Sequence, residues 1–375
     1  NPHFISCRNM SMKFIDLDNQ FKRIENNLKK RFDTVFNHKQ FINGPEITEL
    51  EEILAEYVGV KFCITTANGS DSLFLSLMAL GIGKGDQVIT SPFTYVATAE
   101  MIKLTGATPV FADIDENTFN IDPEKIKAKI NKKTKAILPV SIFGQCADFS
   151  RINAIAKEHA LFVIEDGAQS FGSQYQGNMS GNLSKIGCTS FFPSKPLGCY
   201  GDGGAIFTND SKIATICKEI RVHGQKERYV HKRIGVGGRM DTLQCAILLA
   251  KLERFSWEVE RRKYLGNRYN LMLDDIGVNR VIQRTDRDSV FGQYTIKVKE
   301  RDRVRDCLKN SGIPTAVHYP VPINEQLAYN KFCCDGCTPV AHQLAKEVMS
   351  LPMSADLRED NQDKIINLLN LLLNK

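Results

Sequence analysis

Long apolar runs are missing from this chain of 375 residues. No segment approaches the roughly 18 uninterrupted apolar residues of a membrane-spanning helix, which argues against an integral membrane protein. Residues 1–11 also lack the apolar centre of a secretory signal. Because Met12 looks like the natural start, we expect residues 1–11 to be a tag or leader, and we predict a cytoplasmic protein.

Two glycine-rich nucleotide-binding patterns are incomplete as well. The polar turn at residues 67–72 is not followed by the Gly-Lys-Ser/Thr of a phosphate-binding loop. Residues 81–86 read Gly-Ile-Gly-Lys-Gly-Asp, which does not fit the dinucleotide pattern Gly-x-Gly-x-x-Gly. These absences count against a nucleotide hydrolase and against a nicotinamide-dependent dehydrogenase.

The sequence also lacks a recognisable zinc or disulfide framework. Cys333, Cys334 and Cys337 have metal-ligand spacing, but no second Cys-x-x-Cys or matching His pair completes the roughly four ligands of structural zinc. We therefore expect a flexible surface loop there and no metal site. The eleven cysteines, several of them in apolar runs, are expected to be reduced thiols, as in the cytoplasm.

Basic residues exceed acidic ones only modestly, with a net charge of +6, and they are scattered along the chain. The densest cluster, residues 221–239, is interrupted by glycines and carries no series of aromatic residues for stacking on bases. This pattern favours a solvated surface with a local site for an anionic ligand, and it argues against a nucleic-acid partner.

Short β-branched runs alternate with helical patterns between residues 61 and 208. The expected strands are residues 62–66, 87–90, 109–113, 136–140, 161–165, 188–192 and 205–208. The expected helices between them are residues 70–80, 95–105, 123–130 and 149–159. Strands that are apolar throughout and separated by helices predict an α/β fold with a mostly parallel seven-stranded sheet, covered on both faces.

The pattern changes after Asp241. A long helix is expected there, followed by one strand and three shorter helices. These elements are residues 241–273, 293–298, 302–310, 339–349 and 361–373. The sequence therefore predicts a large domain over residues 12–255, with N-terminal helices, and a smaller C-terminal α+β domain over residues 256–375.

Lys195 stands in a turn rich in Gly, Pro and Ser that follows a predicted buried strand. Partial desolvation in such a turn lowers the pKa of a lysine and frees its amine to form a Schiff base. The glycines that follow, from Gly198 to Gly204, allow a ligand to approach the backbone closely. A surface lysine needs no such setting, yet spacing alone leaves both interpretations equally open.

Asp166 follows four apolar residues and Glu165, at the point where a parallel strand is expected to end. Ligands of open α/β sheets bind outside these strand ends. A carboxylate there can cap a helix, bind Mg²⁺, or pair with the protonated pyridine nitrogen of pyridoxal phosphate (PLP). The lysine turn elsewhere in the chain gives weight to the last interpretation.

Gly69 and Ser70 lie in a small polar turn between a predicted strand and a predicted helix. The free N–H groups and the dipole at a helix start suit a phosphate group. An ordinary capped helix start is the other interpretation, and the turn alone does not decide between them.

Together, and in this order, these segments resemble the sugar aminotransferases of the DegT/DnrJ/EryC1/StrS family. The resemblance extends over nearly the whole chain from Met12, and its most specific parts are the lysine turn and Asp-Gly-Ala-Gln at 166–169. The matching segments are residues 41–45, 67–71, 92–98, 165–170, 190–204 and 315–320. It implies the aspartate-aminotransferase fold (PLP fold type I) and a homodimer with two active sites at the subunit interface.

For the cofactor, the resemblance implies that Lys195 forms the internal aldimine with PLP and moves the proton of the 1,3-shift. Asp166 would keep the pyridine nitrogen protonated. Gln169 would lie beside the ring, and Tyr95 would stack on it. The phosphate would be held by Gly69, Ser70 and Ser190.

For the substrates, the resemblance implies L-glutamate as amino donor and a UDP-linked keto sugar as acceptor. His318, Tyr319 and, from the partner subunit, Arg239 would face the sugar nucleotide. The lysine turn is most similar to members that aminate UDP-2-acetamido-2-deoxy-3-oxo-glucuronate for O-antigen; 4-keto- and 3-keto-6-deoxy sugars also suit the scaffold. From the residues alone, a packed loop at His318 and Tyr319 and an ion pair at Arg239 stay open.

The chain departs from the family pattern at Gly237. Close relatives often place an asparagine of the partner subunit on the phosphate at this position, within a stretch that reads Gly-Val-Gly-Gly-Arg here. Because glycine has no side-chain donor, a weaker cofactor or cross-subunit contact is expected unless backbone N–H groups replace it.

Two other classes of function share this fold. Sugar dehydratases of the family typically carry His in place of the lysine, so Lys195 argues against that activity. A non-enzymatic binding or regulatory protein has no need of Lys195, Asp166 and Gln169 together, so their presence argues against that class.

Overall fold

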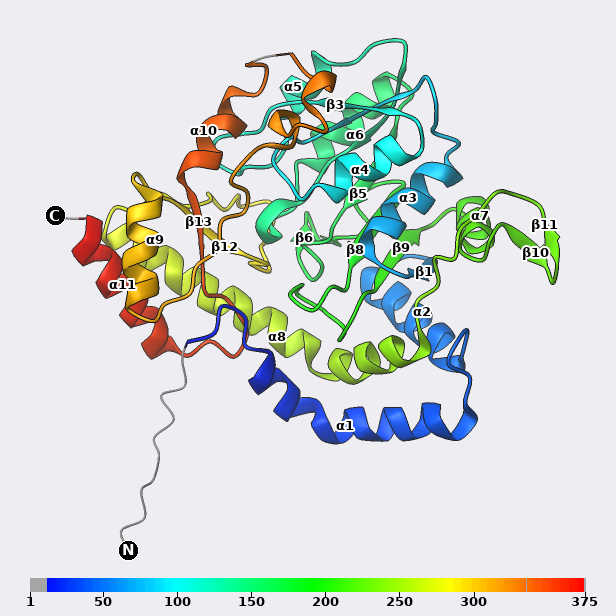
Figure 1. Ribbon diagram of the computed structural model, residues 1–375, viewed down its shortest axis with the longest axis horizontal. Helices are drawn as coiled ribbons and strands as arrows, with labels where there is room; N and C mark the ends of the chain where they lie inside the picture. Colours follow the sequence, from blue (N-terminus) through cyan, green and yellow to red (C-terminus); the bar gives the residue numbers. More distant parts are fainter. Residues whose placement is uncertain (1–11, 335, 374–375) are drawn as a thin grey trace, which may run out of the picture.

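The computed structural model describes residues 12–334 and 336–373 and is built around a seven-stranded sheet in the order β1-β9-β8-β5-β4-β2-β3 (Figure 1). The strands are β1 Phe62–Thr66, β2 Gln87–Thr90, β3 Thr108–Phe111, β4 Thr134–Leu138, β5 Phe162–Asp166, β8 Ile186–Ser190 and β9 Gly204–Thr208. β9 is antiparallel to both its neighbours, and the remaining pairs are parallel. The predicted mostly parallel α/β sheet is confirmed.

Helices cover both faces of this sheet because its strands are apolar on both sides. On β9, Ile206 packs in a cluster with Leu73 of α3, whereas Phe207, one residue on, packs with Leu54 of α2. The helices of this part are α2 Pro45–Val58, α3 Gly69–Ala79, α4 Ala97–Leu104, α5 Pro123–Lys127, α6 Phe149–Glu158 and α7 Ser211–Arg221. α1 (Leu17–His38) packs along α8 (Thr242–Asp275) at one edge of the molecule (Figure 1).

Several helices begin at residues that satisfy their first N–H groups. The side chain of Asn68 accepts from Asp71 N–H at the start of α3. Asp148 and Asp210 cap α6 and α7 in the same way. Such caps stabilise a helix by about 1 kcal/mol each and fix where it starts. At α3, the Asn68 cap fixes the helix start at Gly69, so the N–H groups of the first turn point towards the end of the sheet.

The C-terminal part forms a second core on the far half of α8. Its elements are β12 Tyr294–Lys297, α9 Arg301–Asn310, α10 Pro339–Glu347, β13 Val348–Leu351 and α11 Glu359–Leu373. α8 contributes Phe255 to the first core and Tyr269 to the second. It therefore joins the two parts, while the domain division at residue 255 stays a prediction.

The prediction of a helix over residues 339–349 is wrong at its C-terminal end. α10 stops at Glu347, and the next four residues form β13, which pairs antiparallel with β12. All four residues of β13 are buried. A strand satisfies their backbone groups through its partner, and that partner lies some fifty residues earlier in the chain, beyond the reach of a local pattern.

Short elements complete the chain. They are the hairpin strands β6 Gln174–Tyr175, β7 Asn178–Met179, β10 Gln225–Glu227 and β11 Val230–His231, and the 3₁₀ turns η1 Ile142–Gly144, η2 Ile323–Glu325 and η3 Asn330–Phe332. The β10–β11 hairpin extends away from the body of the protein (Figure 1). No helix within residues 12–334 and 336–373 has the length and hydropathy of a membrane crossing.

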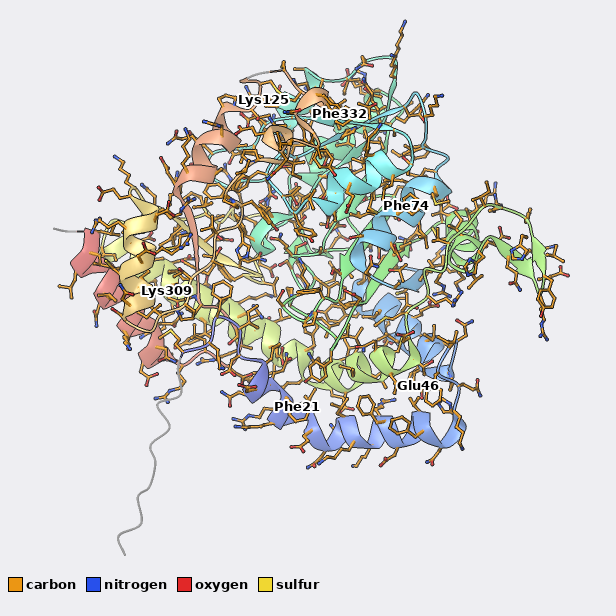
Figure 2. The ribbon with its side chains drawn as sticks, in the orientation of Figure 1. Phe21, Glu46, Phe74, Lys125, Lys309 and Phe332 are labelled. Atoms are coloured by element: carbon orange, nitrogen blue, oxygen red, sulfur yellow. A yellow bond between two sulfur atoms is a disulfide. The ribbon has the colours of Figure 1, made fainter. Side chains whose placement is uncertain are left out.

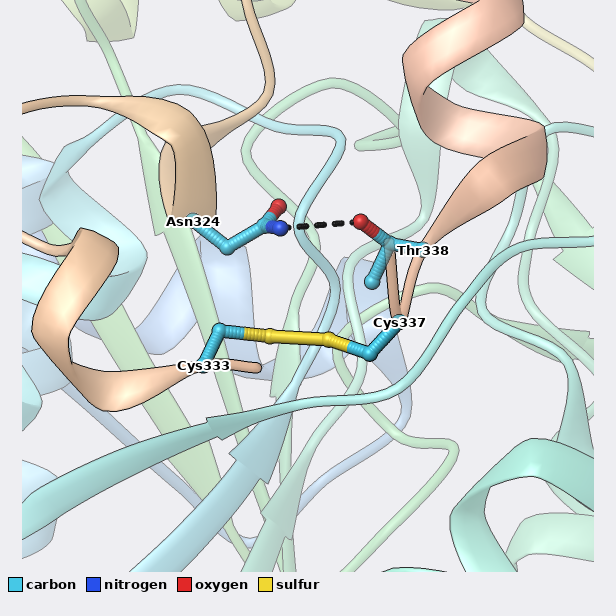
Figure 3. Close-up of a disulfide and its surroundings, with 4 residues drawn as sticks. All are labelled: Asn324, Cys333, Cys337 and Thr338. Atoms are coloured by element: carbon cyan, nitrogen blue, oxygen red, sulfur yellow. Dashed lines mark hydrogen bonds between the residues drawn. A yellow bond between two sulfur atoms is a disulfide. The ribbon is translucent and has the colours of Figure 1, made fainter. Parts of the chain in front are cut away.

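A disulfide joins Cys333 and Cys337 just before α10 (Figure 3). Gly336, with φ of +68°, supplies a left-handed turn between them. Phe332, labelled in Figure 2, directly precedes Cys333. Its ring centroid lies 5.1 Å from Lys103 Nζ of α4. The expectation that every cysteine is a reduced thiol is therefore wrong for this pair, although eight other cysteines of the described segments are free.

We predict that Gly266→Ala destabilises the protein. A Cβ at this position of α8 would lie 2.3 Å from the Phe291 ring, which is itself only 5% exposed. Overpacking of this kind lowers the free energy of unfolding by about 1–3 kcal/mol, although alanine in a helix interior normally adds about 1 kcal/mol. Urea unfolding measures the effect.

The control is the double variant Gly266→Ala/Phe291→Leu, in which the smaller side chain should recover part of the loss. A Gly266→Ala protein as stable as the wild type would contradict this packing.

Candidate active site

A cavity of ≈ 590 Å³ lies at the carboxyl ends of the central parallel strands, where α/β sheets bind their ligands. Asp166 is the last residue of β5 and Ser190 the last of β8, and these two strands are neighbours in the sheet. Nine of the predicted site residues line this cavity: Gly69, Ser70, Tyr95, Asp166, Gln169, Ser190, Lys195, His318 and Tyr319. The fold thus brings together residues that are up to 250 positions apart in the chain.

Asp166 is a buried carboxylate, 6% exposed, and burial raises the pKa of this group. Three interactions oppose that rise. Ala168 N–H donates to Oδ1 at 3.2 Å, the Thr98 hydroxyl donates to Oδ2 at 2.9 Å, and Lys195 contributes a positive charge. The site is therefore suited to a ligand that brings a second positive or N–H group to the carboxylate.

Lys195 sits in the turn that follows β8. Its N–H donates to Phe192 O at 2.8 Å, which closes the turn. Desolvation lowers the pKa of the Lys195 amine, and the charge of Asp166 opposes this shift. A lysine with a lowered pKa has a larger neutral fraction, which is the form that acts as a nucleophile or takes up a proton.

Gly198 allows this turn to fold tightly. A Cβ at Gly198 would lie 2.6 Å from Phe192 O and 2.7 Å from Pro193 O, so no larger residue fits. The Gly198 carbonyl accepts a hydrogen bond from Lys251, a buried residue of α8. The turn that presents Lys195 is thus attached to the long helix behind it.

The start of α3 forms the donor-rich end of the cavity. The N–H groups of Gly69 and Ser70 lie in the first helical turn, where the helix itself offers no acceptor. Gly69 lies so close to Ser190 that a Cβ would be 2.5 Å from Ser190 Cβ. Backbone donors, two hydroxyls and the helix dipole together suit an anion such as a phosphate.

Gln169, Tyr319 and His318 form one wall. Gln169 Nε2 donates to the Tyr319 hydroxyl at 3.2 Å, and its Oε1 accepts from Phe143 N–H at 2.8 Å. Burial raises the pKa of Tyr319 and lowers the pKa of His318 to about 4, with the charge of Lys195 adding to the second effect. Both side chains are therefore neutral near pH 7.

Tyr95 lies on the loop between β2 and α4 and is 59% exposed, so its ring is accessible to a ligand in the cavity. Thr98, one helical turn later, was not among the predicted site residues. Its only sequence signal is a hydroxyl near a helix start, three residues after Tyr95, and its partner Asp166 is distant in the chain.

Arg239 does not line the cavity of its own chain. It is half-buried, and among the described residues no hydrogen bond or ion pair involves its guanidinium group. The neighbouring Gly238 carbonyl accepts from Ala67 N–H at 2.9 Å, so this segment runs beside the start of α3. The role of Arg239 across a subunit interface stays a prediction.

At Gly237, a Cβ would lie 3.2 Å from the His223 ring. The imidazole therefore stands beside the position from which the relatives' asparagine side chain would start. The weaker contact expected from glycine at this position stays a prediction.

The model of the DegT/DnrJ/EryC1/StrS aminotransferase family matches residues 22–370. The UDP-2-acetamido-2-deoxy-3-oxo-D-glucuronate aminotransferase of Pseudomonas aeruginosa is 53% identical over 342 residues, covering 91% of this chain and 95% of the relative.

Two solved structures extend the likeness to three dimensions. A family member from Brucella abortus superposes with a TM-score of 0.94 at 41% identity, covering 97% of this chain and 100% of that one. NtdA from Bacillus subtilis, solved with bound cofactor PMP, gives a TM-score of 0.87 at 28% identity, covering 98% and 87%. The cavity residues, the fold and these relatives together establish that the chain is an aminotransferase of the DegT/DnrJ/EryC1/StrS family.

Proposed function

We propose that this protein is a PLP-dependent aminotransferase that moves an amino group from L-glutamate to the keto carbon of a UDP-linked sugar. The proposed acceptor is UDP-2-acetamido-2-deoxy-3-oxo-D-glucuronate, and the product is the 3-amino sugar nucleotide for O-antigen or another surface polysaccharide. The observation that carries the proposal is the placement of Lys195 and Asp166 in one cavity. The 53% identical relative, named for this substrate, supports the choice of sugar.

The cavity fits PLP at both ends. The start of α3 and Ser190 offer donors for the phosphate, and the buried Asp166 carboxylate offers an acceptor for a protonated ring nitrogen. Tyr95 is accessible for stacking, and Gln169 is held in place by Phe143 and Tyr319. When bound, PLP supplies an electron sink that makes the proton on the amino-bearing carbon acidic.

Lys195 is the residue that moves the proton. Its amine has a lowered pKa because of desolvation, so it can accept a proton from the substrate carbon and return it to a neighbouring position. Thr98 and Ala168 donate hydrogen bonds to the Asp166 carboxylate, and these bonds favour its charged form. The site performs both half-reactions with the same residues, since glutamate and sugar occupy the cavity in turn.

The sugar nucleotide is placed by His318, Tyr319 and, in a homodimer, by Arg239 of the partner subunit. The first two line the cavity, and Arg239 has no ion-pair partner among the described residues of its own chain. In the proposed homodimer, a guanidinium group without an ion-pair partner in its own chain suits the carboxylate or diphosphate of the substrate. We propose that the enzyme acts in the cytoplasm.

Replacing Lys195 by Ala should abolish the absorption band of the lysine Schiff base in the protein reconstituted with PLP. It should also lower the turnover rate by about 10²–10⁴-fold or more, because the proton carrier is lost. Absorption spectra and stopped-flow addition of L-glutamate measure both effects.

Lys185→Ala is the matched control, because Lys185 precedes β8 at the end opposite to Ser190, does not line the cavity and pairs with Asp210. An unchanged spectrum in Lys195→Ala would contradict the assignment of the lysine.

Mixing inactive Arg239→Ala and Lys195→Ala proteins should restore activity if Arg239 acts across the dimer. Random exchange makes half of the dimers hybrid, each with one intact site, so about a quarter of the wild-type activity is expected. The unmixed variants serve as controls. No recovery after verified subunit exchange would show that the two residues do not belong to opposite subunits of one site.

The sugar is tested with the pyridoxamine form of the enzyme and a panel of UDP- and dTDP-linked keto sugars. We expect the UDP-linked 3-oxo-glucuronate to restore the absorption spectrum of the PLP form faster than the other sugars. Faster reaction with a 4-keto- or 3-keto-6-deoxy sugar would replace the proposed acceptor while leaving the transaminase assignment in place.

A further inference from the structure

We propose that Ser350, supported by Thr295, is a positioning residue that holds His318 as an N–H donor towards the substrate. The inference rests on the proposed function, since the acceptor is an oxygen of the bound sugar or amino acid. Ser350 and Thr295 belong to β13 and β12 of the C-terminal part and do not line the cavity. They act on the substrate only through His318.

The three side chains form a continuous chain of hydrogen bonds. Thr295 Oγ1 lies 2.9 Å from Ser350 Oγ, and Ser350 Oγ lies 2.9 Å from His318 Nδ1. Thr295 and Ser350 are directly opposite in the β12–β13 ladder. The ladder therefore fixes the distance between the two hydroxyls.

The backbone holds the histidine in the same register. Ala316 N–H donates to Ser350 O at 3.1 Å, and Ser350 N–H donates to Ala316 O at 2.8 Å. His318 follows two residues later, with its ring between those of Phe14 and Tyr319, whose centroids lie 6.2 Å and 5.7 Å away. Its Nδ1 faces Ser350, so Nε2 is the nitrogen available to the cavity.

The burial of the two hydroxyls determines which group donates in each of these hydrogen bonds. Thr295 is 3% and Ser350 0% exposed, and among the described residues the Thr295 hydroxyl has Ser350 as its one hydrogen-bond partner. A buried hydroxyl hydrogen needs an acceptor, so Thr295 donates to Ser350. Ser350 then donates its single hydrogen to His318 Nδ1, and the proton of the neutral imidazole resides on Nε2. In the reverse order, His318 Nδ1 would donate to Ser350 and Ser350 would donate to Thr295. The buried hydroxyl hydrogen of Thr295 would then have no acceptor.

This tautomer suits the substrates. Burial and the charge of Lys195 keep the imidazole neutral, because they lower the pKa of His318 to about 4. The imidazole therefore has one donor and one acceptor. A keto sugar and an amino acid both present carbonyl or carboxylate oxygens, which accept a hydrogen bond and cannot donate one. The opposite tautomer would direct a lone pair at these oxygens and disfavour binding.

The test is the tautomeric state of His318 in the holoenzyme, read by ¹⁵N NMR of the histidine-labelled protein. The chain has seven histidines, and His318→Gln assigns the signal. We expect the proton on Nε2 in the wild type and a mixture of tautomers in Ser350→Ala. Thr295→Val should give an intermediate state, and Thr295→Ser should restore the wild-type state because it keeps the hydroxyl.

Kinetics give the second readout. Ser350→Ala should raise KM for the sugar by about 3- to 10-fold, the loss of one neutral hydrogen bond, while kcat changes less. Ser354→Ala is the control, because Ser354 is also a buried serine but makes no hydrogen bond with Thr295, Ser350 or His318. It should change neither KM nor kcat. Each variant is first shown to retain the cofactor absorption.

A wild-type proton on Nδ1, or a Ser350→Ala protein with unchanged tautomer and unchanged KM, would overturn the inference. The tautomer is read without turnover, so this result is independent of whether the proposed sugar is the substrate. The panel of keto sugars tests that question separately.

Discussion

The buried carboxylate of Asp166 is the constraint around which the site is arranged. A charge at the end of a central strand is stable only when donors or a cation surround it. Thr98, Ala168 and Lys195 meet that need from three different segments. The sheet order explains why they can, since β5 and β8 are neighbours and the turn after β8 presents Lys195 to the end of β5.

The C-terminal part depends on the same centre. His318 and Tyr319 reach the cavity because the segment before them pairs with β13, while Gln169 ties Tyr319 to the large sheet. α8 supports both parts: Lys251 holds the lysine turn through Gly198, and Tyr269, further along the helix, belongs to the second core. The reacting groups and the substrate-facing groups are thus fixed by one connected framework.

The sheet could be predicted from the sequence to within a few residues. The strands at 62–66 and 87–90 match the prediction residue for residue, because both are short runs rich in β-branched residues that are buried along nearly their whole length. Lys195 and Asp166 were each ambiguous alone, and only their combination with the family resemblance selected one cofactor. Placement in a common cavity is the physical information that the sequence did not contain.

The remaining features depend on contacts between distant segments. The predicted helix at 339–349 runs into the first two residues of β13, because the pairing partner β12 lies far earlier in the chain. Ser350 gives no signal in the sequence, because its hydroxyl contacts His318 and does not reach the cavity. The Cys333–Cys337 pair was unexpected because spacing alone does not distinguish a disulfide from free thiols. The proposed role of Arg239 involves a second subunit, and it therefore stays a prediction.

The most direct measurement of the central claim is the site of cofactor attachment. Borohydride reduction of the protein reconstituted with PLP, followed by peptide mass spectrometry, identifies the lysine that carries the pyridoxyl group. The placement of Lys195 beside Asp166 predicts that this group is found on Lys195 alone. A pyridoxyl group on Lys251 or on a surface lysine, with Lys195 unmodified, would contradict it.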